Sequence, residues 1–199
     1  PAATTVIDVS PELLALAERS PDAHPQRADE PYRRALTGLY ARMAATAREL
    51  DHLEAMRHAV GDAAPYDSVD EFAADLDVIH ASLCEHNSTL LARGRLRSLR
   101  RAASVFGFHL AAVDLRQNSE VHERVVAELF AAARPDVDYL ALDEDARVAL
   151  LTAELATARP LASPYVGYSD ETRSELEICH AAAEMRRRYG AGSIVNYVI

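Results

Sequence analysis

The sequence of 199 residues contains no lysine, and all 21 of its basic residues are arginine. This absence excludes a Schiff-base intermediate or a lysine general base within the chain. The sequence has only two cysteines, Cys84 and Cys179, and they form no C-x-x-C motif. Two distant cysteines give no disulfide framework, so we expect a reducing, cytoplasmic environment.

Long apolar runs and positive charge are also scarce. No apolar stretch is long and uncharged enough to span a bilayer, and no signal-peptide pattern is found, so we expect no membrane association. The formal net charge of -10 argues against nucleic-acid binding, which requires a basic surface. A local arginine cluster can still bind a small anion, and a hydrophobic content of 49% is ample for a packed core.

Apolar residues recur at three- and four-residue steps over most of the chain, which predicts a mainly α fold. A long helix is predicted at about residues 29–59. Its apolar stripe consists of Leu36, Leu39, Tyr40, Met43, Ala47, Leu50 and Leu53. The other predicted helices lie at about residues 10–19, 68–83, 88–104, 119–133, 143–158 and 169–189.

The periodicity changes at two places, at about residues 109–115 and 193–199, where short β-type runs predict strands. Two short strands cannot make a sheet of normal size. We therefore expect them to belong to a larger sheet whose other strands lie outside this chain. The expected organisation is an outer helical region at residues 1–105 and a sheet-associated region at residues 106–199, together one compact unit cut from a longer protein.

The strongest candidate site lies in the segment FGFHLAAVDLRQNSEVH, residues 106–122. An apolar run, expected to be a buried strand, leads to Asp114, Arg116 and Gln117, and a helix follows. The Arg116 guanidinium is suited to bidentate binding of a phosphate or carboxylate. Asp114 shares a strand face with Arg116 and could orient it, while Gln117 could form local hydrogen bonds at the helix start. The alternative is a purely structural Arg116.

Two other groups of residues are weaker candidates. His80 and Cys84 lie four residues apart on one predicted helix and could share a metal, but packing of Cys84 in the core is the favoured interpretation. A dense arginine run is expected to pair with neighbouring helices. It consists of Arg93, Arg95, Arg97, Arg100 and Arg101. We expect no metal site in this chain, and no P-loop or G-x-S-x-G motif is present.

Five segments resemble, in the same order, the phosphoenolpyruvate carboxylase family. They are EPYRRALTGLYARM (30–43), YDSVDEFAADLDVIHASL (66–83), GRLRSLRRAASVFGFHLAAVDLRQNSEVH (94–122), RPLASP (159–164) and GAGSIVNYVI (190–199). The third is the sharpest match, and the resemblance covers about residues 11–199. Several motifs in one order are a far more specific signal than any one of them alone.

The resemblance implies carboxylation of phosphoenolpyruvate by bicarbonate, giving phosphate and oxaloacetate, which enters the tricarboxylic acid cycle. It implies an eight-stranded α/β barrel of the TIM type surrounded by helices, with the site at the carboxyl ends of the strands. It also implies Mg²⁺ or Mn²⁺ and a homotetramer in the full-length enzyme. Arg116 matches the arginine of the family's D-[IL]-R-Q motif, which implies a catalytic, substrate-binding role for it.

The sequence lacks other motifs of the family. No TAHPTE-like segment, metal-binding acid cluster or G-R-G-G loop is found. The isolated chain is therefore expected to be inactive, to need no cofactor and to act with the remainder of its own protein. Two alternatives are another barrel enzyme acting on phosphoenolpyruvate and a non-enzymatic helical interaction module. The module predicts a strandless bundle that binds a partner helix through Leu36 to Leu53 and leaves Arg116 exposed and unimportant.

Overall fold

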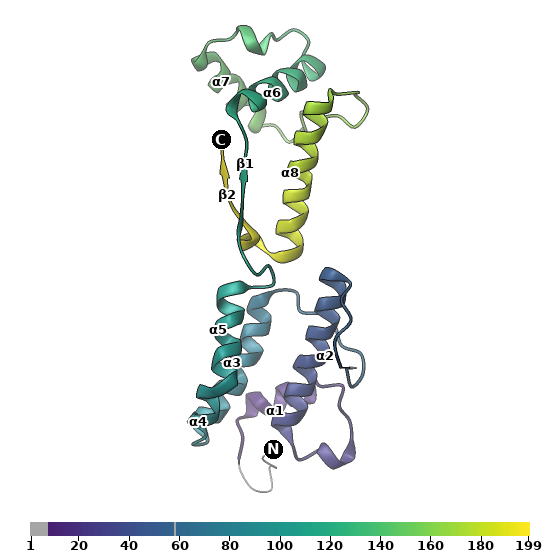
Figure 1. Cartoon of the computed structure of the whole chain (residues 1–199), viewed down its shortest axis with the longest axis vertical. Helices are drawn as coiled ribbons and strands as arrows, with labels where there is room; N and C mark the ends of the chain where they lie inside the picture. The colour runs from purple at the N-terminus through teal and green to yellow at the C-terminus, as the bar shows by residue number, and fades with distance from the viewer. Residues whose placement is uncertain (1–7, 58) are drawn as a thin grey trace. The chain divides into compact units, whose positions relative to one another are not determined.

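The computed structural model describes residues 8–57 and 59–199. The prediction of a mainly α chain with two short strands is confirmed, and the strands are parallel (Figure 1). The chain divides into two units: unit 1 comprises residues 1–111 and 188–193, and unit 2 comprises residues 112–187 and 194–199. The sequence placed a boundary between residues 105 and 106, and the first seven residues of its first region lie outside the described residues.

Unit 1 is a helical bundle. It contains α1 (Pro11–Glu18), the 3-10 turn η1 (Pro25–Arg27), α2 (Pro31–Asp51), α3 (Val69–Glu85), the short α4 (Thr89–Leu91), the π-helical η2 (Ala92–Leu96) and α5 (Arg97–Phe106). Local capping explains where α1 and α3 begin. The Ser10 hydroxyl accepts a hydrogen bond from the Leu13 N–H at 3.3 Å, and the Ser68 hydroxyl accepts one from the Glu71 N–H at 3.2 Å.

The core of unit 1 lies among α1, α2, α3 and α5. Its buried members are Leu13, Leu16, Ala17, Ala35, Leu39, Tyr66, Phe72, Leu76, Ile79 and Ala103. A Cβ atom on Gly38 of α2 would lie only 3.2 Å from the Cα of Ser20, so small residues line this close approach. The apolar stripe predicted for the long helix is wrong in part, because Leu36 of α2 and Leu53, which follows the end of α2, are 52% and 58% exposed.

Two helices differ from their predicted extents. The helix predicted at 29–59 ends at Asp51, because His52 adopts a left-handed conformation (φ 54°) and its N–H bonds back to the Arg48 carbonyl; residue 58 of that prediction lies outside the described residues. The helix predicted at 88–104 is interrupted at Gly94, whose ψ of -131° is not helical. Arg100 of α5 donates to Asp77 of α3 at 2.6 Å, which confirms the predicted helix pairing for this arginine. For the other four arginines of the run the prediction is wrong, because they form no ion pair among the described residues: Arg93, Arg95, Arg97 and Arg101.

Unit 2 places a strand pair beside helices. It contains β1 (Val113–Arg116), α6 (Ser119–Ala133), the 3-10 turn η3 (Tyr139–Ala141), α7 (Glu144–Leu155), most of α8 (Asp170–Tyr189) and β2 (Ile194–Val198), which follows the short turn η4 (Ala191–Ser193). Phe130 of α6 is fully buried and stacks on Tyr139, with ring centroids 5.6 Å apart. The strand register pairs Val113 with Ile194, Leu115 with Tyr197, and Arg116 with Val198.

The strand bounds correct the sequence prediction. β1 covers 113–116 rather than 109–115, because residues 107–112 form a turn in which Gly107 and Leu110 have positive φ and the Leu110 N–H bonds to the Phe106 carbonyl. β2 covers 194–198 rather than 193–199. Arg116 is thus the last residue of β1 and does not follow it.

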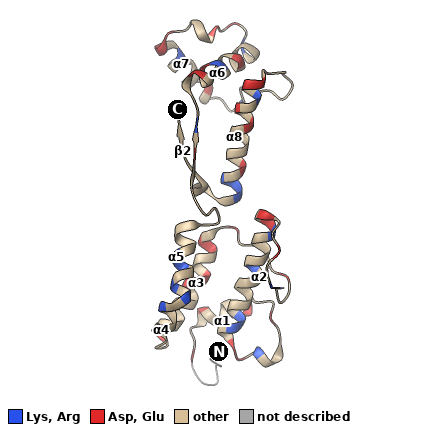
Figure 2. Ribbon diagram, in the orientation of Figure 1, with Lys and Arg blue, Asp and Glu red and all other residues tan. Residues whose placement is uncertain are grey.

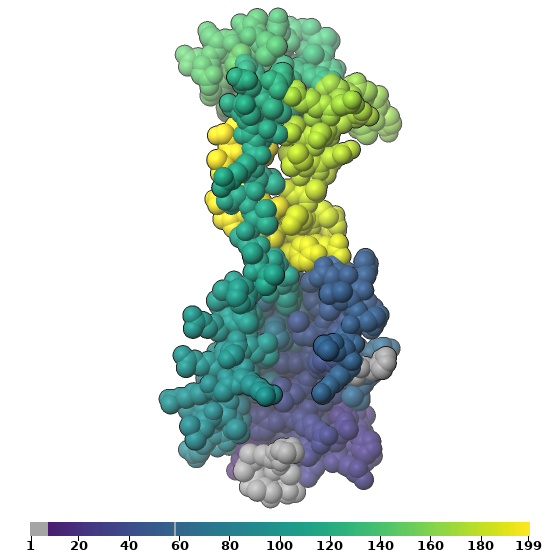
Figure 3. Space-filling model, viewed as in Figure 1, coloured from purple at the N-terminus to yellow at the C-terminus, as the bar shows by residue number. Residues whose placement is uncertain are grey.

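The expectation of a buried strand is wrong for this chain. In β1, only Leu115 is partly buried, and in β2 only Ile194 is buried. Figure 3 shows both strands at the surface of unit 2. Parallel strands are normally covered on both faces, so this apolar pair is unusual. No helix among the described residues is long and apolar enough to cross a membrane.

Candidate functional site

The candidate site is the carboxyl end of β1, where Arg116 closes the strand opposite Val198 of β2. The Arg116 side chain is exposed. Among residues 8–57 and 59–199 it forms no hydrogen bond and no ion pair. The carboxyl ends of parallel strands are where α/β proteins bind their ligands. Arg116 is therefore a positive charge that is available to an anion.

Asp114 lies two residues before Arg116, but its side chain binds Asn196 and not Arg116. Its Oδ1 accepts a hydrogen bond of 2.9 Å from the side-chain amide of Asn196 in β2. This contact ties the two strands together. The predicted role of Asp114 in orienting Arg116 stays a prediction, because no contact between the two side chains exists within the part of the chain that the structure describes.

Gln117 follows Arg116 and forms three hydrogen bonds. Its backbone N–H donates to the Val198 carbonyl at 3.0 Å. Its side-chain Nε2 donates to Oε1 of Glu175 at 2.6 Å, and its Oε1 accepts from the Asn118 N–H at 2.7 Å. Asn118 in turn caps α6 by accepting a hydrogen bond from the Glu120 N–H at 2.9 Å. The end of β1 and the start of α6 are thus fixed by consecutive residues.

Sequence reasoning missed Glu175 and Tyr197 as neighbours of this region. Glu175 on α8 is buried, with 8% of its surface exposed, although it lies 58 positions from Gln117 in the sequence. The Tyr197 hydroxyl lies 2.8 Å from Nε2 of His122. The pKa of Tyr197 is raised mainly by burial, and further by the nearby Cys179 and Glu175. No periodicity or motif in the sequence identifies these contacts.

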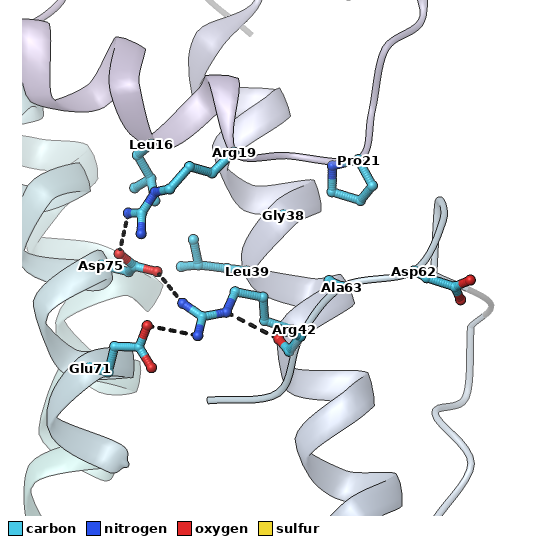
Figure 4. Close-up of a pocket in the computed structure, with 11 residues that line it drawn as sticks. Leu16, Arg19, Pro21, Gly38, Leu39, Arg42, Asp62, Ala63, Glu71 and Asp75 are labelled. Carbon is cyan, nitrogen blue, oxygen red and sulfur yellow. Dashed lines mark hydrogen bonds and ion pairs between the residues drawn. The ribbon is translucent and has the colours of Figure 1, made fainter. Parts of the chain in front are cut away.

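A second candidate is a cavity of about 370 Å³ in unit 1. Figure 4 shows Asp75 of α3 between two arginines that approach from different elements. Arg19 lies 2.7 Å from Oδ1 of Asp75, and Arg42 lies 3.5 Å from Oδ2. Arg42 also lies 2.7 Å from Glu71. Each positive charge that lines the cavity is therefore offset by a carboxylate.

Further contacts identify this charged cluster as structural. The Tyr66 hydroxyl donates to Oδ2 of Asp75 at 3.0 Å, and the Arg42 guanidinium lies 3.8 Å from the Tyr66 ring centroid. Burial, and then the negative charge of Asp75, raise the pKa of Tyr66, while Arg42 lowers the pKa of Glu71. These groups already serve as partners for one another, whereas Arg116 has none among the described residues.

The residues around Arg116 do not fit a divalent cation. Among the described residues, no three His, Cys, Asp or Glu side chains lie close enough together to hold a metal ion. Asp114 is the only carboxylate of β1, and it is bound by Asn196. In unit 1 the Cys84 sulfur lies 3.9 Å from Nε2 of His80, a contact that no third ligand completes in the described chain.

An arginine at the carboxyl end of a parallel strand lies where α/β enzymes place their sites, and its guanidinium is suited to a carboxylate or a phosphate. The family model described as phosphoenolpyruvate carboxylase matches residues 2–199. The chain therefore belongs to the phosphoenolpyruvate carboxylase family.

Curated relatives agree with this assignment. The chain is 61% identical over 194 residues to a phosphoenolpyruvate carboxylase of Aromatoleum aromaticum, covering 98% of this chain and 21% of the relative. It is 59% identical to one of an Azoarcus species over the same shares, and 56% identical to one of Bradyrhizobium diazoefficiens over 99% of this chain and 21% of the relative. The chain thus spans about a fifth of the length of these relatives.

Proposed function

We propose that this chain is the part of a phosphoenolpyruvate carboxylase that supplies Arg116 to the phosphoenolpyruvate site. The proposed reaction joins bicarbonate to phosphoenolpyruvate and releases oxaloacetate and phosphate. The observation that carries the proposal is the exposed guanidinium at the carboxyl end of β1, which has no partner among the described residues. Family membership and the motif Asp114-Leu115-Arg116-Gln117 support it further.

Arg116 would act by binding and by electrostatic stabilisation. Its planar guanidinium can donate two parallel hydrogen bonds to a phosphate or a carboxylate of the substrate. A fixed positive charge there stabilises negative charge that develops as the phosphoryl group passes to bicarbonate and an enolate forms. The expected Mg²⁺ or Mn²⁺ would be bound by other parts of the carboxylase, so no step described here depends on it.

The strand pair would be part of a larger α/β barrel. Val113 and Val195 are 50% and 62% exposed, and β2 carries no charged residue, as the tan strand in Figure 2 indicates. Such surfaces are covered when parallel strands have neighbours on both edges and helices outside. In this proposal the chain is inactive alone. It works in the cytoplasm with the rest of a carboxylase that assembles as a homotetramer.

The test is a chimaera in which this chain replaces the aligned segment of the Aromatoleum aromaticum carboxylase. We expect bicarbonate-dependent oxaloacetate formation in the chimaera. Arg116→Ala should lower kcat/KM by about 10²–10³-fold, the scale for losing a major electrostatic contact. Arg116→Lys should recover part of the loss, because it restores charge without bidentate geometry.

Arg187→Ala is the matched control, since Arg187 is also an exposed arginine of unit 2 and, among the described residues, pairs only with Glu184 of the same helix. It should leave the kinetics unchanged. Near-normal kinetics of a folded Arg116→Ala chimaera would make Arg116 structural. A folded but inactive chimaera, beside an active parent enzyme, would refute the proposed function as a whole.

The second candidate is the helical interaction module. Exposed Leu36 and Tyr40 on α2, which line a groove, favour it, and the exposure of Arg116 agrees with both candidates. Its prediction of a strandless bundle is wrong, because β1 and β2 pair. The chimaera separates the candidates: the module predicts no carboxylase activity, whereas the proposed function predicts activity that Leu36→Ser with Tyr40→Ser leaves intact.

A further inference from the structure

Glu175 occupies a position where a carboxylate is costly. Its side chain is 8% exposed on α8, and its Oε2 is buried without a hydrogen-bond partner among the described residues. Burying a charged or polar group without full hydrogen bonding costs free energy that an apolar side chain would not. Simple packing therefore does not account for a glutamate here. Its one hydrogen bond, through Oε1 to Gln117, is the contact that requires an acceptor.

The orientation of the Gln117 amide follows from the chemistry of its two partners. The partner at 2.6 Å is a carboxylate oxygen, which accepts, so Nε2 of Gln117 must face Glu175. The partner at 2.7 Å is the Asn118 N–H, which donates, so Oε1 must face the backbone. Rotating the amide by half a turn would lose both hydrogen bonds. Glu175 thus selects one of two orientations of the Gln117 side-chain amide.

The fixed amide constrains Arg116. Gln117 is held by its backbone bond to Val198 and by both ends of its side chain. The planar peptide bond between Arg116 and Gln117 transmits that restraint to the end of β1. The Asn118 N–H that receives the amide oxygen lies at the N-cap of α6, so the direction of the chain after the strand is fixed as well.

We propose that Glu175 is a positioning residue: by holding the Gln117 amide it fixes the backbone at the end of β1, the point from which the Arg116 side chain reaches phosphoenolpyruvate. This inference rests on the proposed function of Arg116 and deepens it. Glu175 touches neither substrate nor reacting atoms in this proposal. Its removal should therefore weaken substrate binding and leave chemistry largely in place.

The kinetic test uses the chimaeric carboxylase with Glu175→Leu, Glu175→Gln, Gln117→Leu and the double variant Gln117→Leu/Glu175→Leu. We expect Glu175→Leu to raise KM for phosphoenolpyruvate about 3–10-fold with a smaller change in kcat, the scale of one lost hydrogen bond. Glu175→Gln keeps an acceptor and should stay near wild type. The double variant should be no worse than Gln117→Leu, because the two side chains act through one contact.

Glu177→Leu is the control, since Glu177 is an exposed carboxylate two residues further along α8 and should leave KM unchanged. A Glu175→Leu variant with normal KM, or effects of the two single variants that multiply in the double variant, would overturn the inference. A rise in KM for Glu175→Gln as large as that for Glu175→Leu would also overturn the inference, because the hydrogen-bond acceptor at position 175 would then not be the relevant feature.

A second measurement does not depend on carboxylase activity. Amide hydrogen exchange of the 199-residue chain, followed by NMR, reports on the Gln117 and Asn118 N–H groups directly. We expect Glu175→Leu to speed their exchange about tenfold while α7 is unaffected, the size of a lost contact of about 1.4 kcal/mol. Unchanged exchange would overturn the positioning role. If Glu175→Leu speeds exchange but the chimaera without this substitution is inactive, the proposed function of Arg116 is refuted while the Glu175–Gln117 contact is supported.

Discussion

The two units differ in how they bury their apolar residues. Unit 1 packs four helices around one core that includes Leu13 and Leu76, both fully buried. Among the described residues of unit 2, the buried apolar side chains are fewer. They are Val125, Leu129, Phe130, Tyr139, Ala182 and Ile194. The strands of unit 2 leave Val195 and Val198 62% and 49% exposed.

This difference separates the source of stability from the candidate site. The arginines that line the cavity of unit 1 are paired with Asp75 and Glu71, although unit 1 also exposes apolar residues such as Leu36. Unit 2 carries Arg116, which has no partner within the described part of the chain, beside an uncovered parallel strand pair. The proposed substrate arginine thus belongs to the unit with fewer buried apolar residues.

Core truncations test this contrast most strongly. Leu76→Ala in unit 1 and Phe130→Ala in unit 2 each remove a side chain that is 0% exposed. We expect each to lower the free energy of unfolding by about 3–5 kcal/mol, through lost burial and a residual cavity. Hydrogen exchange should locate the loss in the unit that holds the substitution. Equal loss of protection in both units would instead indicate one cooperative fold.

The buried ion pair of unit 1 gives the next effect. Asp75→Ala removes one of the two carboxylates that pair with Arg42 and leaves the buried Tyr66 hydroxyl without its acceptor. We expect a loss of about 3 kcal/mol in the free energy of unfolding by urea. The value lies at the low end for buried pairs because Arg42 keeps Glu71 and because Arg19, the other partner of Asp75, is 58% exposed and can be solvated. Asp77→Ala, on the same helix, is the control. Asp77 pairs with Arg100 while 59% exposed, so its loss should cost about 0.5 kcal/mol. Equal losses would contradict the structural role of the cluster.

Sequence periodicity was sufficient where neighbours in the sequence decide the structure. The start of the helix at 68–83 and both ends of the helix at 119–133 are predicted correctly, because caps and apolar spacing act within a few residues. The start of β1 was misplaced. The turn at Gly107 and Leu110 depends on backbone conformations that an apolar run does not reveal.

The candidate site was only partly visible in the sequence. Arg116 could be singled out by its place after an apolar run and by its motif. The exposure of Arg116 could not be predicted from the sequence, because the apolar run suggests a buried strand while the structure leaves both strands largely uncovered. The contacts of Asn196 with Asp114 and of Glu175 with Gln117 join residues that lie 82 and 58 positions apart. Such pairs depend on the fold and leave no local pattern.

Matched helix caps compare the two units at a smaller scale. Ser68→Ala removes the cap of α3 in unit 1, and Asn118→Ala removes the cap of α6 in unit 2. We expect each to lower the free energy of unfolding by about 1 kcal/mol. Only Asn118→Ala should also raise KM of the chimaera, because the Asn118 side chain caps α6 directly after Arg116 and Gln117. A change in KM for Ser68→Ala would break the distinction between a stabilising unit and a site-bearing unit.

Acid should produce the smallest effect, and it should be detectable in both units. The hydrogen bond from Arg27 lowers the pKa of Asp22 in unit 1, and hydrogen bonds from Ser169 and then Thr172 lower the pKa of Glu128 in unit 2. A carboxyl group with a lower pKa in the folded chain binds fewer protons there than in the unfolded chain. Its contribution is therefore complete above the unfolded value of about 4 and is lost as the pH falls through the folded pKa.

Urea unfolding between about pH 7 and pH 3 measures this loss, because the window spans the unfolded carboxyl pKa of about 4. Asp22→Asn should make the stability of unit 1 less dependent on pH, and Glu128→Gln should do the same for unit 2, with hydrogen exchange to separate the units. Neither variant should change the dependence above about pH 5, where both carboxyl groups are ionised in the folded and unfolded chains. If Glu128→Gln left the decrease in the stability of unit 2 between about pH 5 and pH 3 unchanged, the contacts of Glu128 with Ser169 and Thr172 would not stabilise that unit. The stability of that unit would then come from its buried apolar side chains, which include the stacked pair Phe130 and Tyr139.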